Sequence, residues 1–159
     1  MKRVLITLHN TRRGYFNYIG KAVLISTIPA IVLAVVLSVI IPNAKAPELK
    51  GSIFTIVIGV LIISPWVETL LMWLILRILK FFLRNLNYLA LSSALIWALL
   101  HSLFAPIWGL IIFWSVFVLS TSFLEWEKKS KFTAVWVTAT IHMCQNSLVV
   151  LAIVLEGTG

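Results

Sequence analysis

The stretch that decides the fold runs from residue 53 to residue 82 and reads IFTIVIGVLIISPWVETLLMWLILRILKFF. A helix needs about 20 mostly apolar residues to cross a bilayer, and this stretch is longer than that. Glu68 is the one charged residue in it before Arg77. An ionisable group at membrane depth costs about 3 kcal/mol on insertion scales, so such a group usually faces a protein interior or a wet cavity and marks a functional site.

Four more apolar stretches have the length of membrane helices. They cover residues 22–41, 86–104, 107–124 and 132–155. The chain has 159 residues, of which 61% are hydrophobic and 11% are charged, whereas soluble domains carry about 25% charged residues. We therefore predict one all-α domain over residues 1–159, a polytopic membrane helix bundle of about five transmembrane helices.

Lysine and arginine are concentrated on one side of the predicted membrane. The N-terminal segment 1–21 and the links after residues 76 and 124 hold 11 of the 13 positive residues, and Lys45 and Lys50 lie on the other side. Positive residues favour the cytoplasmic side. We expect a multi-pass protein of the inner or plasma membrane, with a cytoplasmic N-terminus and an external C-terminus. Positive charge distributed in this way reports orientation in the bilayer rather than nucleic-acid binding.

Two features of the first 46 residues have more than one interpretation. Segment 1–21 mixes basic and aromatic residues, so it is either a short amphipathic helix at the membrane interface or a disordered basic tail. Residues 44–46 resemble a signal-peptidase cleavage site. The apolar stretch before them is too long for a typical signal core, so we expect the first span to be retained.

Three further polar groups lie inside the apolar segments: His101, His142 and Asn146. Along a straight helical hairpin, Glu68 and His101 are each about 24 Å from the turn between their helices. His142 and Asn146 share a helix face and lie about 16 and 22 Å from the start of their span. The four groups therefore lie at a similar depth, in the outer half of the membrane, although depth alone does not make them face one another.

Each of these residues also has a structural interpretation. A buried carboxyl, histidine or asparagine can hold neighbouring helices together through hydrogen bonds. Cys144 lies two residues from His142 and faces elsewhere on the helix, so we expect a small buried thiol rather than a nucleophile. We expect Glu125 and Glu127, at the wet end of their span, to be solvated.

Three short motifs carry these residues in order: PWVETLLMW at 65–73, WALLH at 97–101 and HMCQN at 142–146. Over residues 64–150 they resemble the CAAX prenyl protease type II family, also called CPBP or Abi, of intramembrane endopeptidases. That family has a second glutamate and an arginine where this chain has Thr69 and Trp73.

The resemblance implies an enzyme that hydrolyses a peptide bond. Glu68 would activate water with help from His101, and His142 and Asn146 would stabilise the oxyanion. The substrate would be a membrane-associated peptide or protein, and no cofactor would be needed. A zinc ion on Glu68, His101 and His142, with one open position, is the alternative.

Two other functions fit the same residues. Thr69 and Trp73 suit a pseudoenzyme, a non-catalytic binding or bacteriocin-immunity type of protein. A small transporter or scaffold subunit could use the buried polar groups to move protons or to join helices. The apolar surface of such a bundle suits lipid or a second copy of the chain.

Overall fold

The computed structural model describes residues 2–43 and 51–157, and every regular element in this part of the chain is helical. This confirms the all-α class. The elements, in chain order, are α1 (Lys2–His9), the 3-10 turn η1 (Thr11–Arg13), α2 (Tyr15–Ile40), α3 (Ile53–Ile58), the π-helical segment η2 (Gly59–Ile63), α4 (Ser64–Leu79), α5 (Leu86–Ser102), α6 (Trp108–Glu127) and α7 (Lys131–Gly157). The cleavage-site motif at 44–46, Lys45 and Lys50 lie outside the described residues.

Four helices are long and apolar enough to cross a membrane: α2, the continuous helix formed by α3, η2 and α4 (Ile53–Leu79), α6, and α7 over Lys131–Leu151. The fifth predicted span, α5, has 17 residues. At 1.5 Å per residue it is about 26 Å long, which is at the lower limit for a bilayer core of about 30 Å. The structure therefore has four helices of clear membrane-spanning length and one shorter apolar helix.

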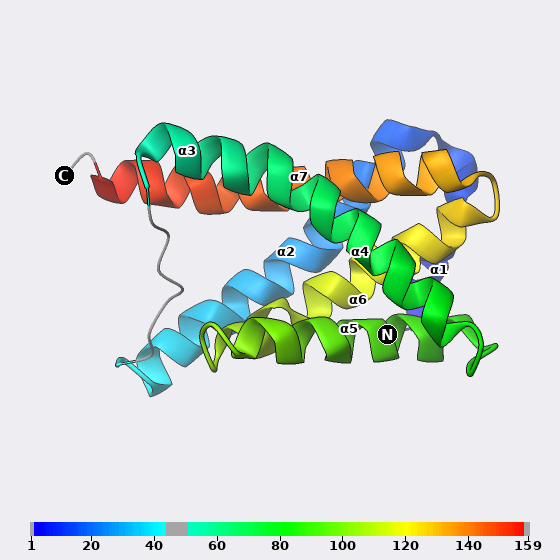
Figure 1. Cartoon of the computed structure of the whole chain (residues 1–159), viewed down its shortest axis with the longest axis horizontal. Helices are drawn as coiled ribbons and strands as arrows, with labels where there is room; N and C mark the ends of the chain where they lie inside the picture. The colour runs from blue at the N-terminus through cyan, green and yellow to red at the C-terminus, as the bar shows by residue number, and fades with distance from the viewer. Residues whose placement is uncertain (1, 44–50, 158–159) are drawn as a thin grey trace.

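The long helices run between two ends of the molecule (Figure 1). The turns α4–α5 and α6–α7 and the start of α2 gather at one end, and the α5–α6 turn and the end of α7 lie at the other. Side chains join the three basic regions at the first end, where the Lys129 ammonium donates to the Thr11 carbonyl at 2.8 Å and Lys80 pairs with Glu127. The sequence-based grouping of these regions on one side agrees with this arrangement.

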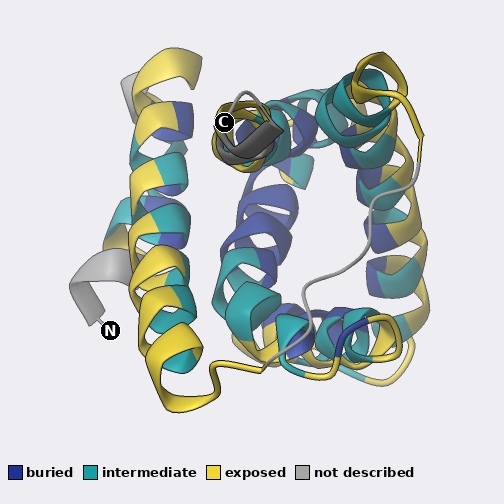
Figure 2. Ribbon diagram, turned by 90° about the vertical axis from the view of Figure 1, so that its left-hand side faces the viewer, coloured by how far each residue is buried: buried dark blue, intermediate teal, exposed yellow. Residues whose placement is uncertain are grey.

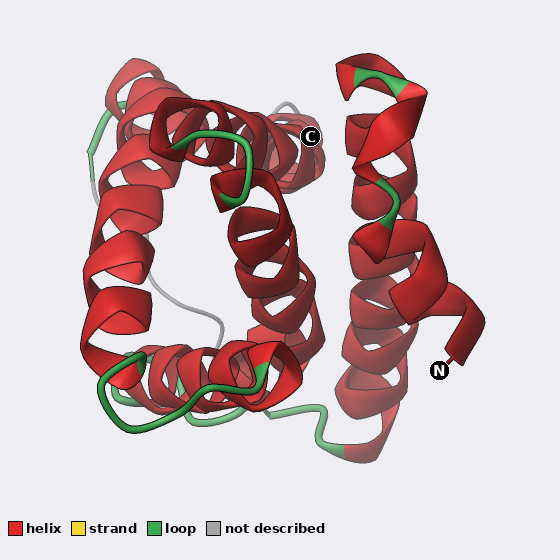
Figure 3. Cartoon of the chain, turned by 90° about the vertical axis from the view of Figure 1, so that its right-hand side faces the viewer, coloured by secondary structure: helices red, strands yellow, loops and turns green. Residues whose placement is uncertain are grey.

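Helix α6 is the central helix, with 56% of its span buried against 6% for α2. Viewed along the bundle, α4, α5, α6 and α7 form one group, and α2 packs against α6 and α7 from outside (Figures 2 and 3). Large exposed apolar side chains line the outer surface of α2, including Val32, Val35 and Val39. In a bilayer these side chains face lipid, so their exposure carries no hydrophobic penalty.

Pro29 lies inside α2 and has no N–H to donate to the Ile25 carbonyl four residues earlier. The Trp114 indole N–H of α6 donates to that carbonyl at 2.9 Å. In the membrane a free backbone group costs several kcal/mol, so proline is tolerated where a neighbouring side chain replaces the lost donor. The hydrogen bond from Trp114 thus joins α6 to α2 at the turn that contains Pro29.

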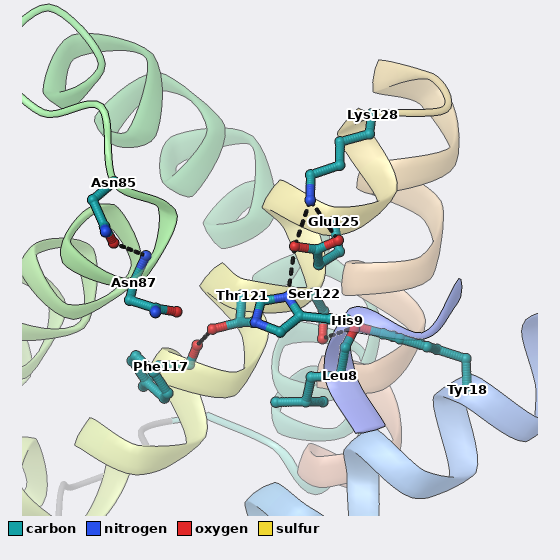
Figure 4. Close-up of polar contacts among 10 residues, drawn as sticks. All are labelled: Leu8, His9, Tyr18, Asn85, Asn87, Phe117, Thr121, Ser122, Glu125 and Lys128. Carbon is teal, nitrogen blue, oxygen red and sulfur yellow. Dashed lines mark hydrogen bonds and ion pairs between the residues drawn. The ribbon is translucent and has the colours of Figure 1, made fainter. Parts of the chain in front are cut away.

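The N-terminal segment is not a disordered tail, because α1 is helical and docks on the bundle. The Leu8 side chain is buried, and the Tyr18 hydroxyl lies 3.0 Å from the Leu8 carbonyl, to which it donates. His9 Nδ1 lies 2.7 Å from the Glu125 carboxylate (Figure 4). These contacts hold α1 against α2 and α6.

The expectation that Glu125 is solvated is wrong. Its side chain is 5% exposed and accepts hydrogen bonds from the Lys128 ammonium at 2.7 Å to both oxygens (Figure 4). A carboxylate can be buried when charged donors satisfy its oxygens. Lys128 is the C-terminal cap residue of α6, three positions after Glu125, and His9 comes from α1. Glu125 is thus buried because the N-terminal segment covers it, which no local pattern in α6 indicates.

Candidate functional site

Glu68 lies in the second turn of α4, just after the π-helical segment η2. Its side chain is 26% exposed, and one carboxylate oxygen accepts a hydrogen bond from the Ser64 hydroxyl on the preceding turn. Single π-helical turns inside α-helices occur frequently at functional sites. Here the wider turn and Pro65 precede the carboxylate directly.

His142 of α7 faces the other oxygen of this carboxylate. Its Nε2 lies 3.8 Å from Glu68 Oε2, and the histidine side chain is 14% exposed. This separation is longer than a hydrogen bond, but it is short enough for charge interaction and leaves the pair close enough for one bridging water. The two residues, 74 positions apart in the chain, are thus the central pair of the candidate site.

Asn146, one turn beyond His142, is bound to the backbone of η2. Its Nδ2 donates to the Val60 carbonyl at 2.8 Å. Within the π-helical turn the Ser64 N–H donates to Gly59, five residues back. The next donor in that series would serve Val60, but it is Pro65, which has no N–H. Asn146 therefore replaces the donor that the proline removes.

His101 lies at the C-terminal end of α5, and its Nδ1 is 2.9 Å from the Trp97 carbonyl. A carbonyl oxygen only accepts, so Nδ1 carries the proton, and in the neutral ring Nε2 is left as an acceptor. The ring also meets Trp108 edge-on, with centroids 5.1 Å apart.

The zinc alternative requires three of these side chains to converge. Within residues 2–43 and 51–157, no three His, Cys, Asp or Glu side chains are placed to hold one metal ion. Glu68 and His142 approach each other, but His101 does not complete a ligand set with them. The described arrangement does not fit a zinc centre on Glu68, His101 and His142.

The two positions that depart from the family motif have different surroundings. Thr69 is 1% exposed, and its hydroxyl has no hydrogen-bond partner in the described part of the chain. Trp73 is partly buried and lies under the Arg77 guanidinium, 5.8 Å from the ring centroid. Neither side chain makes a hydrogen bond or ion pair with Glu68 in the described part of the chain, whereas the Ser64 hydroxyl donates to this carboxylate.

Cys144 is exposed, so the expectation of a buried thiol is wrong. It lies on the side of α7 that faces α2, away from the Glu68–His142 pair. At this depth an open groove, which Cys144 lines, separates α7 from α2, so the thiol is left uncovered.

Sequence reasoning missed Ser64, Val60 and Pro65 as parts of the site. The available signal was Pro65 inside a predicted membrane span, because a proline there always leaves a carbonyl that another group must satisfy. Which group does so depends on the packing of α7 against η2, and the sequence alone does not supply that.

No family model, curated protein or solved structure matches this chain at a significant level.

Proposed function

We propose that the protein is an intramembrane endopeptidase that hydrolyses a peptide bond by water attack. The observation that carries the proposal is the Glu68–His142 pair, a carboxylate and an imidazole 3.8 Å apart inside apolar helices. Support also comes from the order and spacing of Glu68, His101, His142 and Asn146, which resemble the CPBP motifs.

In the proposed reaction Glu68 takes a proton from a water that bonds to both its carboxylate and His142, and the water oxygen adds to the carbonyl carbon of the scissile peptide bond. The C–N bond then breaks, and the protonated Glu68 gives its proton to the leaving amine. Amide hydrolysis needs a base near a trapped water and a donor where negative charge develops. Ser64 holds one carboxylate oxygen in place, which leaves Oε2, the oxygen that faces His142, for the water. His101, with Nε2 as an acceptor, would help to orient this water, and His142 would donate to the oxyanion.

The role of a second oxyanion donor suits Asn146 less well, because one of its two amide hydrogens already bonds to the Val60 carbonyl. Its amide carries a second hydrogen that a substrate carbonyl could accept. This contact favours a second candidate function, a non-catalytic binding or bacteriocin-immunity type of protein in which Asn146 is structural. Thr69 and Trp73 favour it as well.

We propose the inner or plasma membrane as the location, with the basic end of the bundle in the cytoplasm. With five crossings, α5 included, the C-terminus lies outside and Glu68 lies in the outer half of the membrane. The substrate would then reach the site laterally or from outside, as a membrane-associated peptide or protein.

The test is cleavage of membrane-embedded and fluorogenic peptides by the purified protein in liposomes. Wild type is compared with Glu68→Gln, His101→Ala and His142→Ala, and with Glu127→Gln as a matched carboxylate outside the site. The protease proposal is supported if the three site variants lose cleavage and Glu127→Gln retains it. If folded wild type leaves all peptides intact, the result supports the non-catalytic binding protein. In that case Glu68→Gln should still bind the peptide.

A further inference from the structure

A small cavity lies between α1 and the start of α2, at the basic end of the bundle. It has a volume of about 80 Å³, several times the roughly 10–15 Å³ that one water requires. The residues that line it are Ile6, Thr7, Leu8, Asn10, Asn17, Tyr18 and Lys21. The side chains of Asn10, Asn17 and Lys21, which carry nitrogen donors, are called its polar wall. Among the residues that the structure describes, no acidic side chain lines this cavity.

The polar wall offers donors that other residues do not use. Asn10 accepts the Arg12 N–H through its side-chain oxygen at 3.2 Å, so its amide N–H groups are free to donate. Asn17 and Lys21 have no hydrogen-bond or ion-pair partner among the described residues. Two amide groups and one ammonium, with no carboxylate beside them, are complementary to an anion such as a phosphate group.

A second, apolar hollow continues from the first. It is an open groove of about 510 Å³ between α2 and α7, and Asn17 and Lys21 belong to both hollows. Its floor includes Gly20, Val23 and Leu24 of α2 and Cys144 of α7. Cys144 lies 13 residues into α7, about 20 Å from the start of that helix, so the groove leads from the basic end into the apolar span.

The walls of the cavity are fixed by contacts that involve no ligand. The Tyr18 hydroxyl donates to the Leu8 carbonyl at 3.0 Å, and the Ser122 hydroxyl lies 3.1 Å from the Tyr18 hydroxyl oxygen. His9 is bound by the buried Glu125 (Figure 4). Because α1 is held on α2 and α6 in this way, the cavity is preformed.

We infer that the two hollows together bind an anionic phospholipid, with the phosphate at Asn10, Asn17 and Lys21 and one acyl chain along Gly20, Val23 and Cys144. The order of polar and apolar surface along the bundle matches that of a phospholipid in the leaflet at the basic end. The segments that gather at this end hold 11 of the 13 lysines and arginines and two of the five acidic residues. Basic pockets between membrane helices on the cytoplasmic side bind anionic lipid headgroups.

The test is native mass spectrometry of the purified full-length protein in detergent, titrated with dioleoylphosphatidylglycerol. Dioleoylphosphatidylcholine, with the same chains and no net charge, is the lipid control. Glycerol phosphate, without chains, tests whether the phosphate alone is sufficient. We expect one phosphatidylglycerol to bind at least fivefold more tightly than phosphatidylcholine, and no retention of glycerol phosphate.

Three variants test the two halves of the site. Lys21→Gln removes the ammonium and should weaken phosphatidylglycerol binding about fivefold, the effect of one lysine near an anionic lipid. Gly20→Leu fills the groove, since a Cβ at Gly20 meets nothing within 4 Å, and replacing a helical glycine favours the helix. It should abolish binding while helicity and melting temperature are kept. Lys131→Gln, an exposed lysine at the same end but outside both hollows, should change binding less than twofold.

The lipid site would be overturned if phosphatidylglycerol and phosphatidylcholine bound with equal affinity. It would also be overturned if Lys21→Gln and Lys131→Gln weakened phosphatidylglycerol binding by the same factor. Retention of glycerol phosphate at the affinity of the lipid would show that a soluble phosphate compound is the ligand instead. Undiminished phosphatidylglycerol binding by folded Gly20→Leu would show that the groove holds no acyl chain.

Discussion

The side-chain amide of Asn146 donates to the carbonyl of Val60, 86 residues earlier in the chain, at 2.8 Å. That carbonyl lies in the π-helical turn before Glu68 and lacks a backbone donor because Pro65 has no N–H. One contact therefore joins α7 to η2 and holds the region from which both Glu68 and His142 project.

Asn146→Leu should lower the free energy of unfolding by about 1–3 kcal/mol, the cost of a buried unsatisfied polar group. The measurement is unfolding in mixed micelles with increasing dodecyl sulfate. Pro65→Ala restores a backbone N–H at the position that can serve Val60, so the double variant should recover part of the loss. A double variant that shows only the sum of the two single effects would contradict this account.

Trp114→Phe should also destabilise the protein by about 1–2 kcal/mol, because it removes the donor to the Ile25 carbonyl that Pro29 leaves free. Trp66→Phe, at an exposed tryptophan, is the matched control and should have little effect. The same micelle unfolding assay applies. If Trp114→Phe and Trp66→Phe unfold alike, the indole N–H contributes nothing and ring packing alone holds α2.

Glu125→Gln should release the N-terminal segment, because it weakens the bonds to His9 and Lys128. Both partners are partly exposed, at 36% and 53%, and can return to water, so we expect a modest cost of about 1–2 kcal/mol. Hydrogen exchange over residues 2–13 should become faster. Glu127→Gln, which breaks the pair with Lys80 at the same end, should leave that exchange unchanged; faster exchange in both variants would mean that Glu125 has no specific role.

Gly109→Ala should separate α5 from α6. A Cβ at Gly109 would overlap the Ala98 carbonyl oxygen and the Ser102 hydroxyl, so the helices cannot keep their close approach. Overpacking of this kind costs about 1–3 kcal/mol. Because His101 lies between these two α5 residues, the variant should also reduce any cleavage activity. Gly59→Ala, where a Cβ meets nothing within 4 Å, is the control, and equal stability of the two variants would contradict the close approach.

The orientation can be measured with single cysteines introduced into Cys144→Ser protein and labelled by an impermeant maleimide in intact cells. Asn10→Cys and Asn85→Cys, at the basic end, should be labelled only after lysis. Asn43→Cys and Leu103→Cys should be labelled from outside. Protection of Leu103→Cys together with labelling of Asn43→Cys would show that α5 does not cross the membrane.

Much of the helical structure follows from local sequence. The turn between α4 and α5 lies where it was predicted, because Asn85 caps α5 by accepting the N–H groups of Asn87 and Tyr88. Helix α2 begins at Tyr15, seven residues before the predicted start of this span, because the helix continues through the polar and aromatic residues 15–21. It begins directly after Gly14, which has φ 78°. Depth counting along the helices correctly placed Glu68 and His142 in one layer.

The sequence by itself determined that the chain is helical and apolar, the approximate positions of its helices, and which end of the bundle is basic, since these depend on residues close together in the chain. Only the tertiary structure decided which polar groups meet. Glu68 faces His142, Asn146 serves Val60 and α1 buries Glu125, whereas Cys144 is left exposed. Those outcomes depend on how α4, α6 and α7 pack and tilt against one another, and side-chain contacts between distant segments are fixed only when that packing is complete.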